Sequence, residues 1–95
     1  MSLLPGIEVP SVAIKVDYPN NPARIIENSV LNPIRSELNS LNNLKSIEST
    51  AGSETGIVKL QFNYDTRMDL AYVEINEKID RLTESLPRDM DRPRI

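Results

Sequence analysis

The chain has 95 residues, a net charge of −3, and neither cysteine nor histidine. This composition excludes disulfides, thiolate chemistry, imidazole bases and nearly every zinc geometry, and an acidic chain without a basic stripe argues against nucleic acid as a partner. Hydrophobic residues make up 39% of the chain and include one Phe and no Trp, so we expect one small domain with an aliphatic core. We expect no cofactor.

A strand and a turn are predicted first along the chain. Residues 11–18 alternate in polarity, which is typical of a half-buried strand. The inward positions are expected to be Val12, Ile14 and Val16, and the outward ones Ala13, Lys15 and Asp17. In the turn "PNNP" that follows, Asn21 is predicted to cap the next helix and Pro22 to be its first residue.

The helix predicted next contains a proline. Apolar residues recur at helical spacing as far as the asparagines of "SLNNL", and they form one stripe of Ile26, Val30, Ile34, Leu38 and Leu41. Pro33 lies inside this repeat, where proline removes one hydrogen bond and crowds the preceding turn at a cost of about 3 kcal/mol. A local feature of the structure must therefore compensate for the cost of Pro33.

Two more strands and a second helix complete the pattern. Residues 44–50 predict a weaker strand, residues 51–56 a turn, and residues 57–64 a strand with Val58, Leu60, Phe62 and Tyr64 pointing inward. The second helix is predicted to begin at a cap, Asp65 or Thr66, and to stop at Pro87. Its apolar positions are Leu70, Val73, Ile75, Ile79, Leu82 and Leu86. Residues 88–95 form a polar tail whose "RPRI" is able to begin another strand.

The order β-α-β-β-α indicates an α+β fold, a two-layer sandwich with both helices on one face of the sheet. A ferredoxin-like fold has one further strand at its end. We therefore expect a single domain over residues 1–95, with a lead-in at 1–10, whose last strand is missing or supplied elsewhere.

Carboxylates are the only candidates for acid–base chemistry. Asp65 with Asp69, and Glu77 with Asp80, are near neighbours at helical spacing. A solvated face is the simpler interpretation of both pairs, because catalysis and cation binding need convergent groups. The methionines at 68 and 90 are isolated, whereas a thioether copper site needs several. We therefore expect neither an enzyme nor a metal site.

Two exposed surfaces carry the remaining signals. The polar side of the sheet holds Lys15, Asp17, Lys59, Gln61 and Asn63, and an open face wetted by solvent is its simpler interpretation. On the second helix, a mixed stripe recurs at i, i+4, i+8 and i+11, namely Asp69, Val73, Glu77 and Asp80. This stripe is either a plain exposed surface or a helix–helix contact around a symmetry axis.

Taken in order, several short segments resemble the periplasmic portion of resistance–nodulation–division (RND) efflux pumps. The segments are "DYPNNP", "VLNPIRSEL", "LKSIEST", "GIVKLQF", "DLAYVEINEKID" and the closing "LP". The resemblance runs from about Leu4 to Pro87, with Asn20 in place of the usual glycine after "YP" and Arg35 in place of the usual glutamate after "PI". Many members carry proline at the position of Pro33, which suggests a bend built into the helix.

The resemblance implies a role for the chain. It would be the first N-terminal porter subdomain of a proton-driven exporter, on the periplasmic side of the inner membrane of a Gram-negative bacterium. Its partners would be the other subdomains, two further copies in a homotrimer, a periplasmic adaptor protein and an outer-membrane channel. No apolar run here approaches the roughly 20 residues that span a bilayer, so the fragment itself is expected to be soluble.

The resemblance also gives roles to both surfaces. The second helix lines a pore on the trimer axis in these pumps, which would make Asp69, Val73, Glu77 and Asp80 pore-facing. Lys15, Asp17, Lys59 and Gln61 match strand positions that border the substrate cleft.

Two other interpretations stay open. A free-standing ferredoxin-like module for ligand binding or regulation is the alternative. An acylphosphatase-like hydrolase is more distant, because no phosphate cradle of arginine and asparagine is recognisable in the first strand–helix turn.

Overall fold

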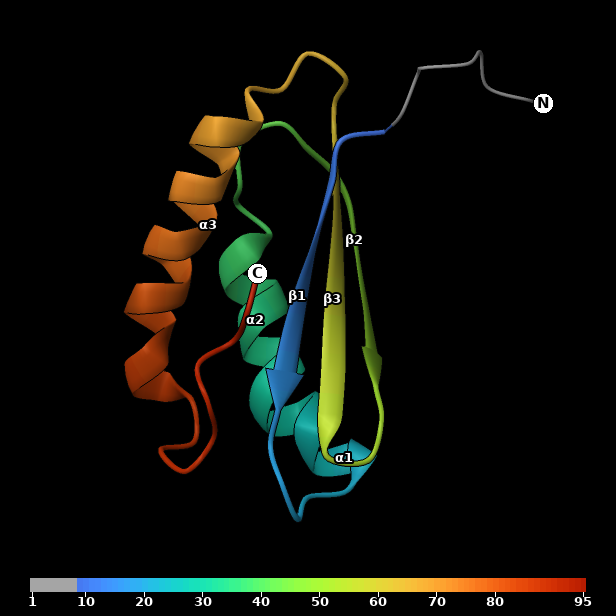
Figure 1. Ribbon diagram of the computed structural model, residues 1–95, viewed down its shortest axis with the longest axis vertical. Helices are drawn as coiled ribbons and strands as arrows, with labels where there is room; N and C mark the ends of the chain where they lie inside the picture. Colours follow the sequence, from blue (N-terminus) through green and yellow to red (C-terminus); the bar gives the residue numbers. More distant parts are fainter. Residues whose placement is uncertain (1–8) are drawn as a thin grey trace, which may run out of the picture.

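Three antiparallel strands form one sheet, and all the helices cover the same side of it, in the computed structural model, which describes residues 9–95 (Figure 1). The strands are β1 (Ser11–Asp17), β2 (Leu44–Ala51) and β3 (Thr55–Phe62), and β3 lies between the other two. This arrangement confirms the predicted two-layer α+β sandwich. Most of the lead-in expected at residues 1–10 lies outside the described residues.

Alternation sets which side of the sheet faces the helices. The three predicted inward residues of β1 are all 5% exposed or less, and so are Val58, Leu60 and Phe62 of β3. Tyr64 was expected to continue this row, but it is 56% exposed. The reason is that β3 ends at Phe62, so the two-residue period no longer applies beyond it.

The first helical segment accommodates Pro33 by a local change in its winding. It consists of α1 (Ala23–Ile26), a π-helical turn η1 (Glu27–Leu31) and α2 (Asn32–Leu38). The backbone N–H of Asn32 bonds to the carbonyl of Glu27, five residues back, so the chain is already wound more widely where Pro33 enters. The π turn also turns both Val30 and Leu31 into the core. The predicted bend is therefore a π turn.

Glycine at position 56 fits this wider turn. A Cβ atom at Gly56 would lie 3.0 Å from side-chain carbons of Ile26, Leu31 and Val16. Ile26 and Leu31 are five residues apart, and the π turn stacks them against the same point of β3. The helix therefore approaches the sheet closely because the strand has no side chain there.

The loop between β1 and α1 differs from the prediction by one residue. Pro22 is the N-cap, because its carbonyl accepts the bonds from the N–H groups of Ile25 and Ile26. Asn21 does not cap the helix; its side-chain amide donates to the carbonyl of Pro19. Asn20 has a φ of 67°, a left-handed conformation that glycine and asparagine adopt most easily.

The second helix, α3 (Met68–Leu82), continues into a short 3-10 turn, η2 (Thr83–Ser85). Its N-cap is Arg67 and no side chain caps it, so the predicted caps at Asp65 and Thr66 are wrong. The prediction that Leu70 and Val73 pack inward is also wrong. The inward side of α3 consists of Ala71, Ile75, Lys78, Ile79 and Leu82.

The charged member of that inward set is Lys78. It is 9% exposed, and its ammonium group donates to the hydroxyl of Ser40 at 2.9 Å. Because this bond joins α3 to the end of α2, a lysine here holds the two helices together.

The C-terminal tail returns to the free edge of β1 (Figure 1). Lys15 and Arg94 exchange both backbone hydrogen bonds, at 2.7 and 2.8 Å, in an antiparallel bridge. Met90 packs against the core on the way. The expected start of another strand is therefore present as a single bridge beside β1, the position that a fourth strand of a ferredoxin-like sheet takes.

Candidate functional site

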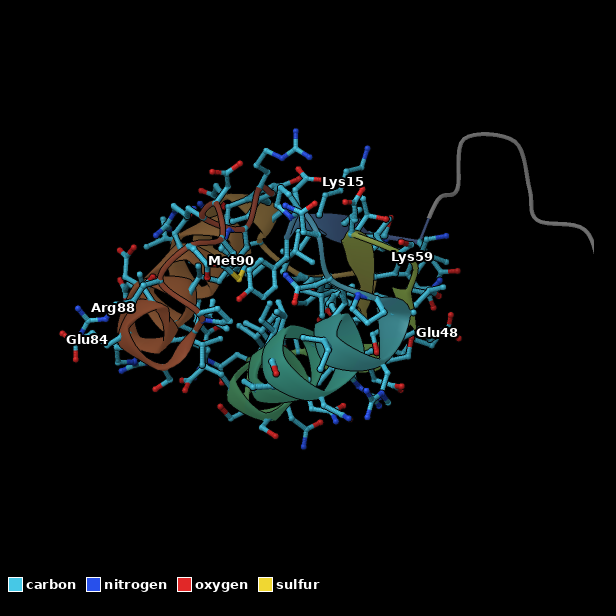
Figure 2. The ribbon with its side chains drawn as sticks, turned by 90° about the horizontal axis from the view of Figure 1, so that it is seen from below. Lys15, Glu48, Lys59, Glu84, Arg88 and Met90 are labelled. Atoms are coloured by element: carbon cyan, nitrogen blue, oxygen red, sulfur yellow. The ribbon has the colours of Figure 1, made fainter. Side chains whose placement is uncertain are left out.

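The open face of the sheet is built from rows of side chains that cross the strands. Directly paired residues of neighbouring strands point to the same face. Thr50, Ile57 and Lys15 form one such row, which Arg94 extends beyond β1. Figure 2 shows Lys15, Lys59 and Glu48 pointing away from the helices.

A shallow groove lies on this face at the end where the β2–β3 hairpin turns. We call it the hairpin groove, and its side chains are Lys15, Asp17, Thr50, Thr55, Ile57 and Arg94. Arg94 and Asp17 form an ion pair within it. Both polar and apolar side chains therefore reach the same hollow.

The structure separates the four residues predicted for a substrate cleft. Lys15 and Asp17 line the hairpin groove, but Lys59 and Gln61 do not. Lys59 pairs with Glu48 in the next row, and Gln61 accepts a hydrogen bond from the hydroxyl of Ser46 at 3.0 Å. All four share the open face, as the alternation predicts.

The other predicted surface, the α3 stripe (Asp69, Val73, Glu77 and Asp80), lies on the side of α3 away from the core. Val73 is 54% exposed, and Leu70 beside it is 59% exposed. The exposed side of α3 thus combines the apolar residues Leu70 and Val73 with carboxylates on both sides of them along the helix, Asp69 before and Glu77 and Asp80 after.

Two of the three acids in the α3 stripe are already paired. Asp69 meets Arg67 at 2.8 Å, and Asp80 meets Arg92. The hydrogen bond from Arg67 lowers the pKa of the Asp69 carboxyl below its usual range. Among residues 9–95, Glu77 has no salt-bridge partner.

Several residues of the hairpin groove were not predicted from the sequence. The sequence pattern predicts Thr50 and Ile57 as ordinary strand residues, Thr55 as part of a turn and Arg94 as part of the polar tail. Pairing of the three strands, together with the bridge between Lys15 and Arg94, brings them beside Lys15. An outward apolar residue in a strand, Ile57, was the one available signal.

A second hollow lies under the C-terminal tail, beside η2. Its lining includes Glu84, Arg88 and Met90. In Figure 2, Met90 points between α3 and the sheet, whereas Glu84 and Arg88 point outward. Asp91 and Arg92 also line this hollow, so charged and apolar side chains share it.

Neither a metal centre nor a membrane span is found in the part of the chain that the structure describes. Within residues 9–95, no three acidic side chains converge in a way that could hold a metal ion. Over the same residues, no helix has the length and apolar character needed to cross a bilayer.

Comparisons with known proteins give one consistent result. The sequence profile of the AcrB/AcrD/AcrF family matches residues 1–95. Over 89 residues the chain is 29% identical to three proteins of Pseudomonas putida: the toluene efflux pump membrane transporter TtgB, the multidrug/solvent efflux pump membrane transporter MepB, and the antibiotic efflux pump membrane transporter ArpB. Each alignment covers 93% of this chain and 8% of the relative.

Proposed function

The chain belongs to the AcrB/AcrD/AcrF family of RND efflux transporters, and from this premise we propose that it is a porter subdomain of a proton-driven exporter. The family match over the whole chain carries the proposal. It favours a part of a transporter over the free-standing ligand-binding or regulatory module. Because the chain spans 8% of the length of its relatives, the activity of the whole protein is part of the proposal.

The α3 stripe is proposed to line the pore on the axis of a homotrimer. Its support is the exposed apolar patch at Leu70 and Val73, which has no packing role in the described chain. Exposed apolar residues in a cluster are typical of a contact surface. Pairing of Asp69 and Asp80 with arginines reduces the repulsion among three copies and leaves Glu77 as the main like-charge contact.

The open face of the sheet is proposed to border the substrate cleft, with Lys15, Asp17, Lys59 and Gln61 in contact with exported compounds. The relatives are described as pumps for toluene, solvents, multiple drugs and antibiotics. We propose organic compounds of this kind as substrates. This part of the transporter is proposed to do no covalent chemistry and to hold no cofactor.

The proposed setting is the periplasmic side of an inner-membrane protein. Its partners there would be the other subdomains of the same transporter, a periplasmic adaptor protein and an outer-membrane channel. The polar open face and the acidic balance of the chain are compatible with an aqueous compartment.

Export by the full-length transporter tests the substrate contact. We would replace Lys59 and Gln61 together by alanine and measure the tolerance of producing cells to a panel of solvents and antibiotics. Arg24→Ala, on the helical side, is the matched control. Lower tolerance of at least one compound is expected, whereas unchanged export of every compound by the double variant would contradict the proposal.

The trimer is expected to depend on the rest of the transporter. The contact offered by the α3 stripe is narrow, and Glu77 repels its copies, so the 95-residue chain alone should stay monomeric. Sedimentation at micromolar concentration tests this, and a stable trimer of the isolated chain would contradict it.

A further inference from the structure

We propose that the hairpin groove binds small amphipathic organic anions, with Lys15 as the residue that holds the anionic group. This inference names a ligand class for the open face and rests on its proposed substrate contact. The groove combines an apolar floor with a lysine that has no salt-bridge partner among residues 9–95. Each of these features has its own origin in the structure.

The hollow exists because of the residues at the hairpin. The row beside Thr50, Ile57 and Lys15 contains Asp17 and Thr55, and it ends at Gly52, whose N–H bonds to the carbonyl of Thr55 at 2.9 Å. Glycine contributes no side chain there, so the surface is lower at this end of the sheet. Ile57 is half-buried and forms the apolar floor.

The charge of the groove comes from a pair of like charges. Lys15 and Arg94 lie directly opposite each other, a cross-strand arrangement that is destabilising when both charges have the same sign. Asp17 neutralises Arg94. Within residues 9–95, no carboxylate lies within 4 Å of the Lys15 ammonium group. One positive charge is therefore left facing the groove.

A ligand that carries an anionic head and an apolar body satisfies both features. Its carboxylate or sulfate would pair with Lys15 and relieve the repulsion from Arg94. Its apolar body would cover Ile57, beside Thr50 and Thr55, which also line the groove. An amphipathic cation would place a second uncompensated positive charge beside Lys15, so the groove discriminates by the sign of the ligand charge.

The test is a titration of the ¹⁵N-labelled chain, followed by amide chemical shifts. The probes are decanoate and decyltrimethylammonium, which share an apolar chain and differ in charge, both kept below their micelle concentrations. Decanoate is expected to shift the amides of Gly52, Thr55, Gly56 and Ile57. Lys15→Met should weaken decanoate binding about three-fold, the size of one exposed ion pair.

Lys45→Met is the matched control, because Lys45 is an equally exposed lysine that lies over the ring of Tyr64 outside the groove. It should leave the affinity for decanoate unchanged. Equal binding of both probes, shifts outside the groove, or full affinity in Lys15→Met would overturn the inference. Loss of export in the Lys59 and Gln61 double variant would still support the wider substrate contact, so the two proposals fail separately.

Discussion

The two helical segments of the described chain, α1–η1–α2 and α3, pack against the same side of the sheet in very different ways. The segment α1–η1–α2 buries Ile26, Val30, Leu31, Ile34 and Leu38, each 1% exposed or less. By contrast, α3 buries one side and leaves Leu70, Tyr72 and Val73 between 42% and 59% exposed. The first segment completes the core, whereas α3 divides its apolar residues between the core and an outer surface.

Burial and exposure point to different roles for the apolar residues of the two segments. A residue with every contact inside the fold is explained by stability alone. An apolar residue that the fold leaves exposed is not, and on α3 such residues share the exposed side of the helix with the carboxylates of the α3 stripe. Substitutions in one helical segment at a time test whether the two segments differ in this way.

The largest difference is expected between a core residue of α2 and an exposed residue of α3. Ile34→Ala removes a fully buried side chain and should lower the free energy of unfolding by about 2–5 kcal/mol. Leu70→Ala should change it by less than about 0.5 kcal/mol in the isolated chain. Urea unfolding of both variants makes the comparison, and equal losses would show that Leu70 is part of the core.

A substitution at Gly56 tests the close approach of the segment α1–η1–α2 to the sheet. Gly56→Val places carbon atoms where Ile26, Leu31 and Val16 already meet, so overpacking should cost about 1–3 kcal/mol. Gly52→Ala is the control, because its Cβ would stand at an ordinary 3.4 Å from the hydroxyl of Thr55. If both variants unfold at the same denaturant concentration, packing of the segment α1–η1–α2 on the sheet does not require glycine at position 56.

The π turn predicts a small effect at Pro33. In a regular helix, replacing proline by alanine would stabilise the protein by about 3 kcal/mol. Because the chain is already widened before Pro33, Pro33→Ala should change the free energy of unfolding by less than about 1 kcal/mol. Thermal and urea unfolding measure this, and a gain near the full value would mean that Pro33 distorts an otherwise regular helix.

The smallest effect concerns the charge on the exposed side of α3. Arg67 lowers the pKa of Asp69, so the pair stabilises the folded state above the ordinary pKa of aspartate, and this contribution is lost as the pH falls through the lowered value. Arg67→Gln should raise the Asp69 pKa toward its usual range. Carboxyl NMR titration measures the shift, and an unchanged pKa would show that the ion pair does not form in solution.

The sequence predicted the inward residues of β1 and of the first helical segment because each apolar row recurs at a regular spacing. Val12, Ile14 and Val16 alternate without interruption, and the stripe from Ile26 to Leu38 keeps its spacing across the π turn. The errors on α3 have a common cause. Leu70 and Val73 are apolar by type, and a single sequence gives no sign of which apolar side faces the core.

The candidate site was only half predictable, for a different reason. The outward positions Lys15 and Asp17 follow from alternation, but the groove also needs Thr50, Ile57 and Arg94. Those residues come from three separate segments, and only strand register brings them together. Register depends on pairing between distant parts of the chain, which the local pattern does not specify.

Cross-linking at position 73 is the decisive experiment for the proposal that the exposed side of α3 meets its copies around an axis. The chain has no cysteine, so Val73→Cys can be placed in the full-length transporter after its other cysteines are removed. Oxidation or a short bismaleimide should join subunits through Cys at this position. Glu48→Cys on the open sheet face should stay unlinked. Subunits that remain separate in Val73→Cys, in a transporter that still exports, would contradict the account.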